Sequence, residues 1–265
     1  MKIKLVLRFM VAHWKAQTEY RFAFFADILV QFFAYGVTII NIWMLFRNIT
    51  TLQGWDFYQI FFLFILNLLS YGITGLFIYD SSRKVEEMVQ NGTFDTLLTR
   101  PLDTFFHLVL KNFSPLFIAH IILSLLLFLA FLDRFGIIWS LGKVIMLFFT
   151  IIGCVLIQAS IMIITSSLSF WFTKSTTVVN AMIYGFRNFI TYPLTIYNRF
   201  IQFLLTFIIP YGFVAYFPAT YFFDKNETMF FPALKYGTLF VGLLMIVLAK
   251  LVWNAGINSY QSSGH

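Results

Sequence analysis

The chain has 265 residues, of which 60% are hydrophobic, 21% are aromatic and only 11% are charged. Average soluble domains carry about 45–50% apolar and about 25% charged residues, so this composition excludes an ordinary water-soluble fold, and the low charge excludes a disordered chain. The net charge of +7 comes with no basic, glycine-rich or Cys/His module, so we expect no nucleic-acid partner and interpret the charge as the basic rim of a membrane protein.

Residues 1–20 are predicted to form a helix that lies on the membrane surface. One helical face carries Ile3, Val6, Leu7, Met10 and Trp14, and another carries Lys4, Arg8, Lys15 and Glu19. A short helix with apolar and basic faces suits the cytoplasmic interface, where anionic lipids attract Lys and Arg. The alternative is that this segment merely extends the first span.

Five apolar stretches are each long enough to cross a bilayer, which takes about 20 mostly apolar residues. In hydrocarbon the backbone must satisfy its own hydrogen bonds, and these runs lack strict alternation, so we predict helices. The five predicted spans are 22–46, 57–79, 105–132, 142–172 and 235–258.

The one sizeable polar segment, residues 80–104, separates the second and third spans. Asp80 or the following serine can cap one helix, which the Asn-Gly pair ending at Gly92 can terminate. Thr93 can cap a second helix that stops before Pro101.

In that second helix, Phe94, Leu97 and Leu98 are predicted to form a compact apolar knob flanked by Asp95 and Arg100. A short exposed helix with such a knob fits a groove on another protein. The alternative is an ordinary loop whose leucines pack against neighbouring helix ends.

Two segments compete for the next crossing. Residues 176–196 hold eight Leu, Ile, Phe or Val residues, which roughly cancel the insertion cost of Arg187. Residues 200–223 are more apolar, but Pro210 and Pro218 would break a straight helix. We therefore expect 176–196 to cross and 200–223 to form a bent, re-entrant hairpin that enters from the outer face, which gives six transmembrane helices in all.

Basic residues set the orientation, because they concentrate on the cytoplasmic side of membrane proteins. With the N-terminus inside, eleven fall on that side: Lys2, Lys4, Arg8, Lys15, Arg21, Arg83, Lys84, Arg100, Lys111, Lys174 and Lys250. Five fall outside: Arg47, Arg134, Lys143, Lys225 and Lys235. The count predicts that the N-terminus and the C-terminus are both cytoplasmic.

Two regions of the chain carry a resemblance to a known family. The run Asn91-Gly-Thr-Phe-Asp-Thr-Leu-Leu-Thr-Arg-Pro-Leu102 resembles the G-T-x-x-x-L-L-x-x-P loop of type-2 ABC transporter permeases, and it lies between the second and third spans as in that family. Residues 192–197, with the proline-containing stretches 207–210 and 216–219, are similar to the fifth span and outer hairpin of an uncharacterised branch of bacterial exporters.

The resemblance implies an all-α, polytopic permease domain over residues 1–265, in a bacterial cytoplasmic (inner) membrane. Its partners would be the lipid bilayer, two cytoplasmic ATPase subunits that bind ATP and magnesium, and a second permease, identical or homologous. The loop helix would couple to the ATPase through Gly92, Thr93, Phe94, Leu97, Leu98, Arg100 and Pro101. The outer hairpin, with Pro210, Tyr216 and Pro218, would help to gate release of substrate.

No cofactor or enzymatic activity is expected in the chain itself. A phosphate-binding loop needs Gly-x4-Gly-Lys-Ser/Thr, and the nearest approach, residues 136–144, is one residue too long and lacks the hydroxyl. His107 and His120 have neither the spacing nor the carboxylate of a zinc site.

Polar residues within spans are expensive and are functional candidates by default. Arg187, with Asn180 and Asn188 close by in sequence, is predicted to line the translocation path. The alternative is a structural pairing of Arg187 with an acid on another span, such as Asp27.

A function of a different class is a carrier driven by an ion gradient, with Asp27, Arg187 or His120 as its relay. Such carriers usually contain internal repeats with paired broken helices, and the sequence has no convincing repeat. The exporter permease is therefore the leading hypothesis.

Overall fold

The computed structural model describes residues 21–100, 103–172, 175–225 and 230–261. Within these ranges the fold is all-helical, and the one β feature is an isolated bridge between Leu52 and Trp55. The prediction of an all-α protein is confirmed. The predicted surface helix over residues 1–20 lies outside the described residues.

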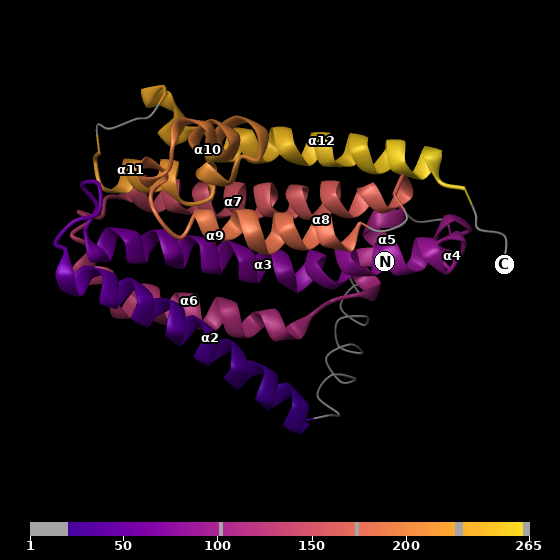
Figure 1. The fold of residues 1–265 in the computed structure, drawn as a ribbon, viewed down its shortest axis with the longest axis horizontal. Coiled ribbons are helices and arrows are strands. Elements are labelled where there is room, and N and C mark those ends of the chain that lie inside the picture. Colours follow the sequence, from indigo (N-terminus) through magenta and orange to yellow (C-terminus); the bar gives the residue numbers. More distant parts are fainter. Residues whose placement is uncertain (1–20, 101–102, 173–174, 226–229, 262–265) are drawn as a thin grey trace.

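Five longer helices form the body of the molecule: α2 (Arg21–Asn48), α3 (Phe57–Gln90), α6 (Ile118–Ala130), α7 (Leu141–Ser167) and α12 (Thr238–Ser259). The shorter helices are α4 (Asp95–Leu98), α5 (Thr104–Lys111), α8 (Thr176–Asn180), α9 (Arg187–Phe189), α10 (Arg199–Phe203) and α11 (Tyr216–Phe222). Helices α3, α6, α7 and α12 run along the long axis of the molecule and α2 is inclined to them, with α4 and the last turn of α12 towards one end and α10 and α11 towards the other (Figure 1).

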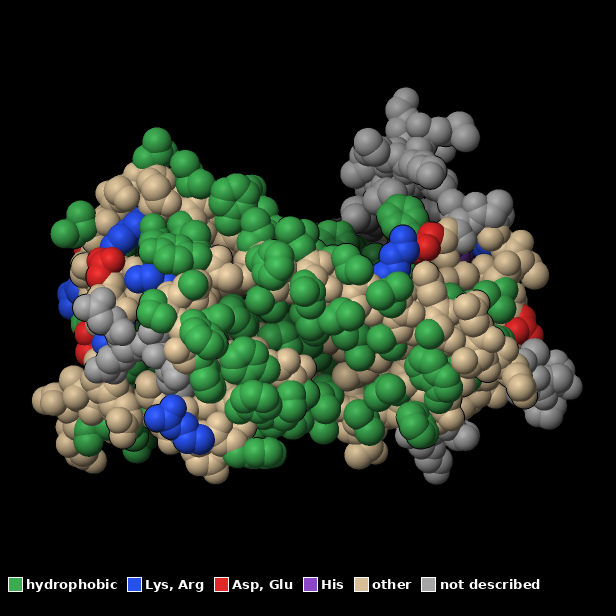
Figure 2. All heavy atoms as spheres, turned by 90° about the horizontal axis from the view of Figure 1, so that it is seen from above, with side chains coloured by type: hydrophobic (Ala, Val, Ile, Leu, Met, Phe, Trp, Pro, Cys, Tyr) green, Lys and Arg blue, Asp and Glu red, His purple; other side chains and the backbone are tan. Residues whose placement is uncertain are grey.

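Four helices in the described residues are long and apolar enough to cross a membrane: Phe25–Asn48, Phe57–Gln90, Leu141–Phe170 and Thr238–Ser259. A fifth span results if the bent pair α10–α11 counts as one. On the face seen in Figure 2, charged side chains lie towards the two ends, and hydrophobic side chains fill the band between them. The molecule is therefore built as a polytopic membrane protein.

Helix α3 is much longer than the predicted span 57–79. It begins at Asp56, whose carboxylate accepts a hydrogen bond from the Gln59 N–H at 2.9 Å, and it runs without a break to the Asn91 cap. Its 34 residues span about 51 Å, more than the roughly 30 Å of a bilayer core. The prediction that a new helix starts at Asp80 is wrong, because nothing between residues 79 and 90 breaks the helix.

The predicted third span, 105–132, is interrupted. Helix α5 ends at Lys111, a short 3-10 turn covers Pro115–Phe117, and α6 follows. Pro115 has no N–H, and its ring would clash with the carbonyl four residues earlier, so the helix cannot continue through it. The Ser114 N–H instead donates to the Leu76 carbonyl at 3.0 Å, which ties the break to α3.

The continuous helical part of the segment 176–196 is Thr176–Phe189, with a π-helical turn at Ala181–Phe186 between α8 and α9, and a separate 3-10 turn covers Leu194–Ile196. The 14 residues of the continuous part cover about 21 Å, which is shorter than a bilayer core. The boundary at 196 is wrong because Pro193 forces the residue before it out of the helical region, and the chain turns at residues 190–193.

The segment 200–223 is bent, as predicted. Helix α10 continues as a π-helical turn over Leu204–Ile208, and this pair meets α11 at an angle of 80° next to Pro210. Pro218 does not break a helix, contrary to the prediction. It is the third residue of α11, where the backbone N–H would have no intrahelical acceptor in any case.

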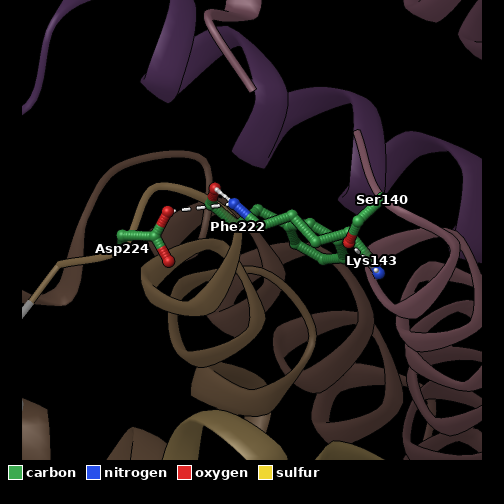
Figure 3. A network of polar contacts seen from close by, with 4 residues as sticks. All are labelled: Ser140, Lys143, Phe222 and Asp224. Carbon is green, nitrogen blue, oxygen red and sulfur yellow. Dashed lines mark hydrogen bonds and ion pairs between the residues drawn. The ribbon is translucent and has the colours of Figure 1, made fainter. Parts of the chain in front are cut away.

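Polar contacts fix this bent pair to the start of α7 (Figure 3). The Lys143 ammonium donates to the Phe222 carbonyl at 3.1 Å and forms an ion pair with the Asp224 carboxylate at 2.9 Å. The Lys143 N–H donates to the Ser140 hydroxyl at 3.3 Å, so the same residue also belongs to the α7 cap. The end of the molecule that holds α10 and α11 is therefore tied together.

Candidate functional site

The loop that the sequence singles out is a tight turn between α3 and α4. Gly92 has φ of +66°, in the left-handed region that favours glycine, and its N–H donates to the Val89 carbonyl. The Phe94 N–H returns to the Met88 carbonyl at 3.1 Å. The predicted cap at Thr93 is wrong, because α4 begins one residue later and has no side-chain cap. The predicted stop before Pro101 agrees with the end of α4, although Pro101 itself lies outside the described residues.

Phe94 anchors α4 to the rest of the protein. Its side chain is 0% exposed, and its ring centroid lies 5.0 Å from that of Phe170, 5.2 Å from that of Tyr260 and 6.2 Å from that of Trp253. Phe170 follows α7, Trp253 belongs to α12 and Tyr260 caps it. Helix α4 is thus held in an aromatic cage built by the ends of two long helices.

The predicted exposed apolar knob is wrong for two of its three residues. Phe94 and Leu97 are both buried within this chain, and only Leu98, 42% exposed, faces outward. Apolar residues at helical spacing identify a buried face, but this pattern cannot tell whether the partner is the same chain or another.

The exposed surface of α4 and of the residues next to it is small and mostly polar. Thr93, Thr96, Thr99 and Arg100 are exposed around Leu98. The Thr96 hydroxyl donates to the Thr93 carbonyl at 2.7 Å, so these hydroxyls stabilise the turn itself. Beside them lies a groove of about 300 Å³ between the ends of α3 and α5. This surface is what α4 offers to a partner.

A second candidate site is an open cleft of about 420 Å³ around Arg187. Its walls come from α2, α3, the break before α6, and the π-helical turn with α9. The Arg187 Nε–H donates to the Asn67 Oδ1 at 3.1 Å, and the guanidinium carbon lies 3.5 Å from the centre of the Tyr71 ring. Arg187 therefore binds an amide and a ring on α3, not Asp27.

The predicted polar stripe does not assemble around Arg187. Asn180 lines a separate small cavity of about 90 Å³ with Ser82 and Ser175, and Asn188 is exposed away from the lining of the large cleft. Asn67 is a polar residue within a span and is therefore a functional candidate from the sequence for the same reason as Arg187. Its contact with Arg187, and the contact of Arg187 with Tyr71, could not be predicted because no spacing rule connects positions more than 100 residues apart.

The three predicted hairpin residues are buried. Pro210 and Pro218 lie in a continuous buried run, residues 210–220, and the Tyr216 ring packs 5.6 Å from that of Trp55. The Lys225 ammonium donates to the Gly54 carbonyl at 2.6 Å, which adds a second tie to the same turn. In this conformation the bent pair is a packed cap on one end of the molecule.

A family model described as ABC-2 family transporter protein matches residues 32–264. No curated protein and no solved structure matches the chain. Since the family match covers nearly the whole sequence and agrees with the all-helical membrane architecture, the chain belongs to the ABC-2 family of transporter proteins, as a type-2 ABC permease.

Proposed function

We propose that this permease forms half of the translocation path of an ATP-driven exporter in a bacterial cytoplasmic membrane. A second permease, identical or homologous, would supply the other half, and two cytoplasmic ATPase subunits would bind ATP and magnesium. The observation that carries the proposal is the placement of α4: it exposes Leu98 at the tip of the molecule while Phe94 packs against the ends of α7 and α12.

This arrangement gives a physical route for coupling. A partner that moves Leu98 also moves Phe94, because the two residues belong to one helical turn. A close-packed core transmits such a displacement, and Phe94 is fully buried in contact with three aromatic rings. The displacement would reach α3 through the Gly92 turn, and α7 and α12 through Phe170 and Trp253.

We further propose six crossings with the N-terminus and the C-terminus in the cytoplasm. The successive passes would be α2, α3, α5 with α6, α7, α8 with α9, and α12, whose directions alternate along the long axis (Figure 1). The bent pair α10–α11 would then be a re-entrant hairpin on the outer side, at the end opposite α4. The pass through α8 and α9 needs neighbouring helices around it, because its 14 residues are shorter than a bilayer core.

Replacement of Leu98 by aspartate is expected to abolish association with the ATPase without unfolding the permease. Leu98 is exposed, so the carboxylate stays in water in the free chain, whereas in an apolar interface its desolvation costs about 2 kcal/mol or more, roughly a 30-fold loss of affinity. The measurement is the amount of soluble ATPase that co-purifies with the tagged permease after mild solubilisation.

The matched control for this experiment is Leu141→Asp. Leu141 is an exposed leucine at the first residue of α7, at the opposite end of the molecule. It should retain the ATPase at the wild-type level. Equal recovery with Leu98→Asp and the wild-type chain would contradict the proposed coupling surface.

Single cysteines at Asn91 and Ile138 test the orientation. Both positions are exposed. Asn91 caps the C-terminal end of α3, and Ile138 lies just before the start of α7, at the opposite end of the molecule. Only Ile138→Cys should therefore react with an impermeant maleimide added from outside. The native Cys154 is buried and should leave little background. Reaction of Asn91→Cys from outside would overturn the proposed orientation.

A further inference from the structure

We propose that the cleft around Arg187 binds the anionic head group of an amphiphile, a phosphate or a carboxylate, with the apolar tail against α2. This names the substrate class of the path proposed above, and its role as a transport substrate rests on that proposal. The binding itself needs no ATPase, so the two can fail independently.

The first argument is the unmatched charge of Arg187. A guanidinium has five N–H donors, and among the residues that the structure describes only the Nε–H of Arg187 has an acceptor, the Asn67 side chain. In the described part of the chain no carboxylate forms an ion pair with Arg187. Uncompensated charge within a membrane domain is costly, and the free fork of N–H groups matches two oxygens of a phosphate or carboxylate.

The second argument is the pre-orientation of the guanidinium. The Asn67 amide holds Nε, and the Tyr71 ring lies against the guanidinium plane at 3.5 Å. Asn67 and Tyr71 are both buried on α3, so this arginine is fixed in place and loses little conformational freedom on binding. An arginine that is fixed in place and lines an open cleft is suited to binding a ligand.

The third argument concerns the other polar groups of the cleft. The Tyr79 and Tyr184 hydroxyls are hydrogen-bonded to each other, and Arg83 donates to the Tyr79 hydroxyl at 2.9 Å, which brings a second positive charge near the cleft. Asp80 also lines the cleft and supplies the opposing negative charge. An anion would therefore bind close to Arg187, and loss of the Asp80 charge should increase the affinity of the cleft for that anion.

The apolar surface of α2 indicates an amphiphile in preference to a soluble anion. Among the α2 side chains that the structure describes, only Ile42 is buried, while Val30, Phe33 and Val37 are all more than half exposed beside the cleft wall at Ala34. The Arg21 end of α2 diverges from the other helices (Figure 1). A lipid tail can lie on this surface while its head group reaches Arg187.

The test is a titration of the full-length permease in neutral detergent, with bound lipid counted by native mass spectrometry. The probes are dioleoyl phosphatidylglycerol, which is acidic, and dioleoyl phosphatidylcholine, which is zwitterionic. We expect the wild-type chain to bind the acidic lipid about 10-fold more tightly, and Arg187→Gln to remove most of that preference. Arg187→Lys should keep part of it because the charge remains.

The matched control is Lys250→Gln, which removes a lysine that lines a different groove on α12. It should leave the preference unchanged. An equal loss in Lys250→Gln, or an undiminished preference in Arg187→Gln, overturns the site. If an equal concentration of glycerol 3-phosphate displaces the acidic lipid, the claim that the ligand is an amphiphile is contradicted, and the cleft is a site for soluble anions.

A second variant keeps the proposal falsifiable if Arg187→Gln does not fold. Asp80→Asn should raise the affinity for the acidic lipid several-fold, because it removes the negative charge that lines the cleft. An unchanged or lower affinity in a folded Asp80→Asn chain contradicts the proposal.

Discussion

Replacing Phe94 by alanine is expected to destabilise the permease by about 3–5 kcal/mol and to release α4 from the helices that it touches. The ring is fully buried and has three aromatic neighbours, so the mutation removes both the buried area and the edge-to-face contacts. The free energy of unfolding in mixed micelles measures the first effect. Co-purification of the ATPase measures the second, because a loosened α4 presents Leu98 less well.

Phe200→Ala is the matched control for Phe94→Ala. Phe200 lies on α10 and is 73% exposed, so its loss should change the free energy of unfolding by less than about 0.5 kcal/mol. If Phe94→Ala is as mild as Phe200→Ala, the aromatic cage does not hold α4, and the proposed route from α4 to α7 and α12 loses its physical basis.

The largest effect of adding a single methyl group is expected at Gly153, on α7. A Cβ atom there would lie 2.7 Å from the Thr238 carbonyl carbon and oxygen of α12, and a Cβ on Gly242 would lie 2.8 Å from the Gly153 carbonyl oxygen. Small residues allow such close approach of helices in membranes. Gly153→Ala should therefore cost about 3 kcal/mol, since backbone atoms cannot rotate away from the clash as side chains can.

Gly36→Ala tests whether this cost comes from packing. Gly36 lies on α2, and a Cβ there would meet no atom within 4 Å. The same chemical change should stabilise the chain by about 0.5–1 kcal/mol, because alanine loses less backbone entropy in a helix. The comparison uses the free energy of unfolding of both variants. A similar sign at the two sites would contradict the close α7–α12 contact.

Hydropathy located the long helices well where one apolar run forms one helix. The predicted spans 142–172 and 235–258 agree with α7 and α12 to within a few residues. The errors occur where local polarity or proline competes with helix formation. Helix α3 continues through eleven mostly polar residues after residue 79, because leaving the bilayer changes the solvent but does not end a helix.

Proline had to be interpreted by its position. Pro115 interrupts the helix of the third pass. The prediction of one continuous span over 105–132 rested on apolar content and did not take this proline into account. The prediction that Pro218 breaks a helix is wrong, because it occupies the first turn of α11, where proline is tolerated. The prediction for Pro210 is confirmed, since it lies at the 80° bend.

The candidate sites show a further limit of sequence reasoning. Arg187 could be singled out because a charge within a span is costly, whereas its contacts with Asn67 and Tyr71 depend on tertiary packing. The loop motif located α4, but the division between the buried Phe94 and the exposed Leu98 depends on where α7 and α12 end. Residue type and spacing predict that one face of a helix is buried, but they do not predict which residues, in this chain or another, bury it.

Cross-linking from Leu98 tests the central claim, that α4 docks on a cytoplasmic ATPase, most directly. Leu98→Cys, carrying a photoreactive maleimide in native membranes, should join the permease to a protein whose peptides include a Gly-x4-Gly-Lys-Ser/Thr phosphate-binding loop. Leu141→Cys at the opposite end should give no such adduct. An adduct from Leu141→Cys to that ATPase, or none from Leu98→Cys in membranes where the ATPase is present, would contradict the account.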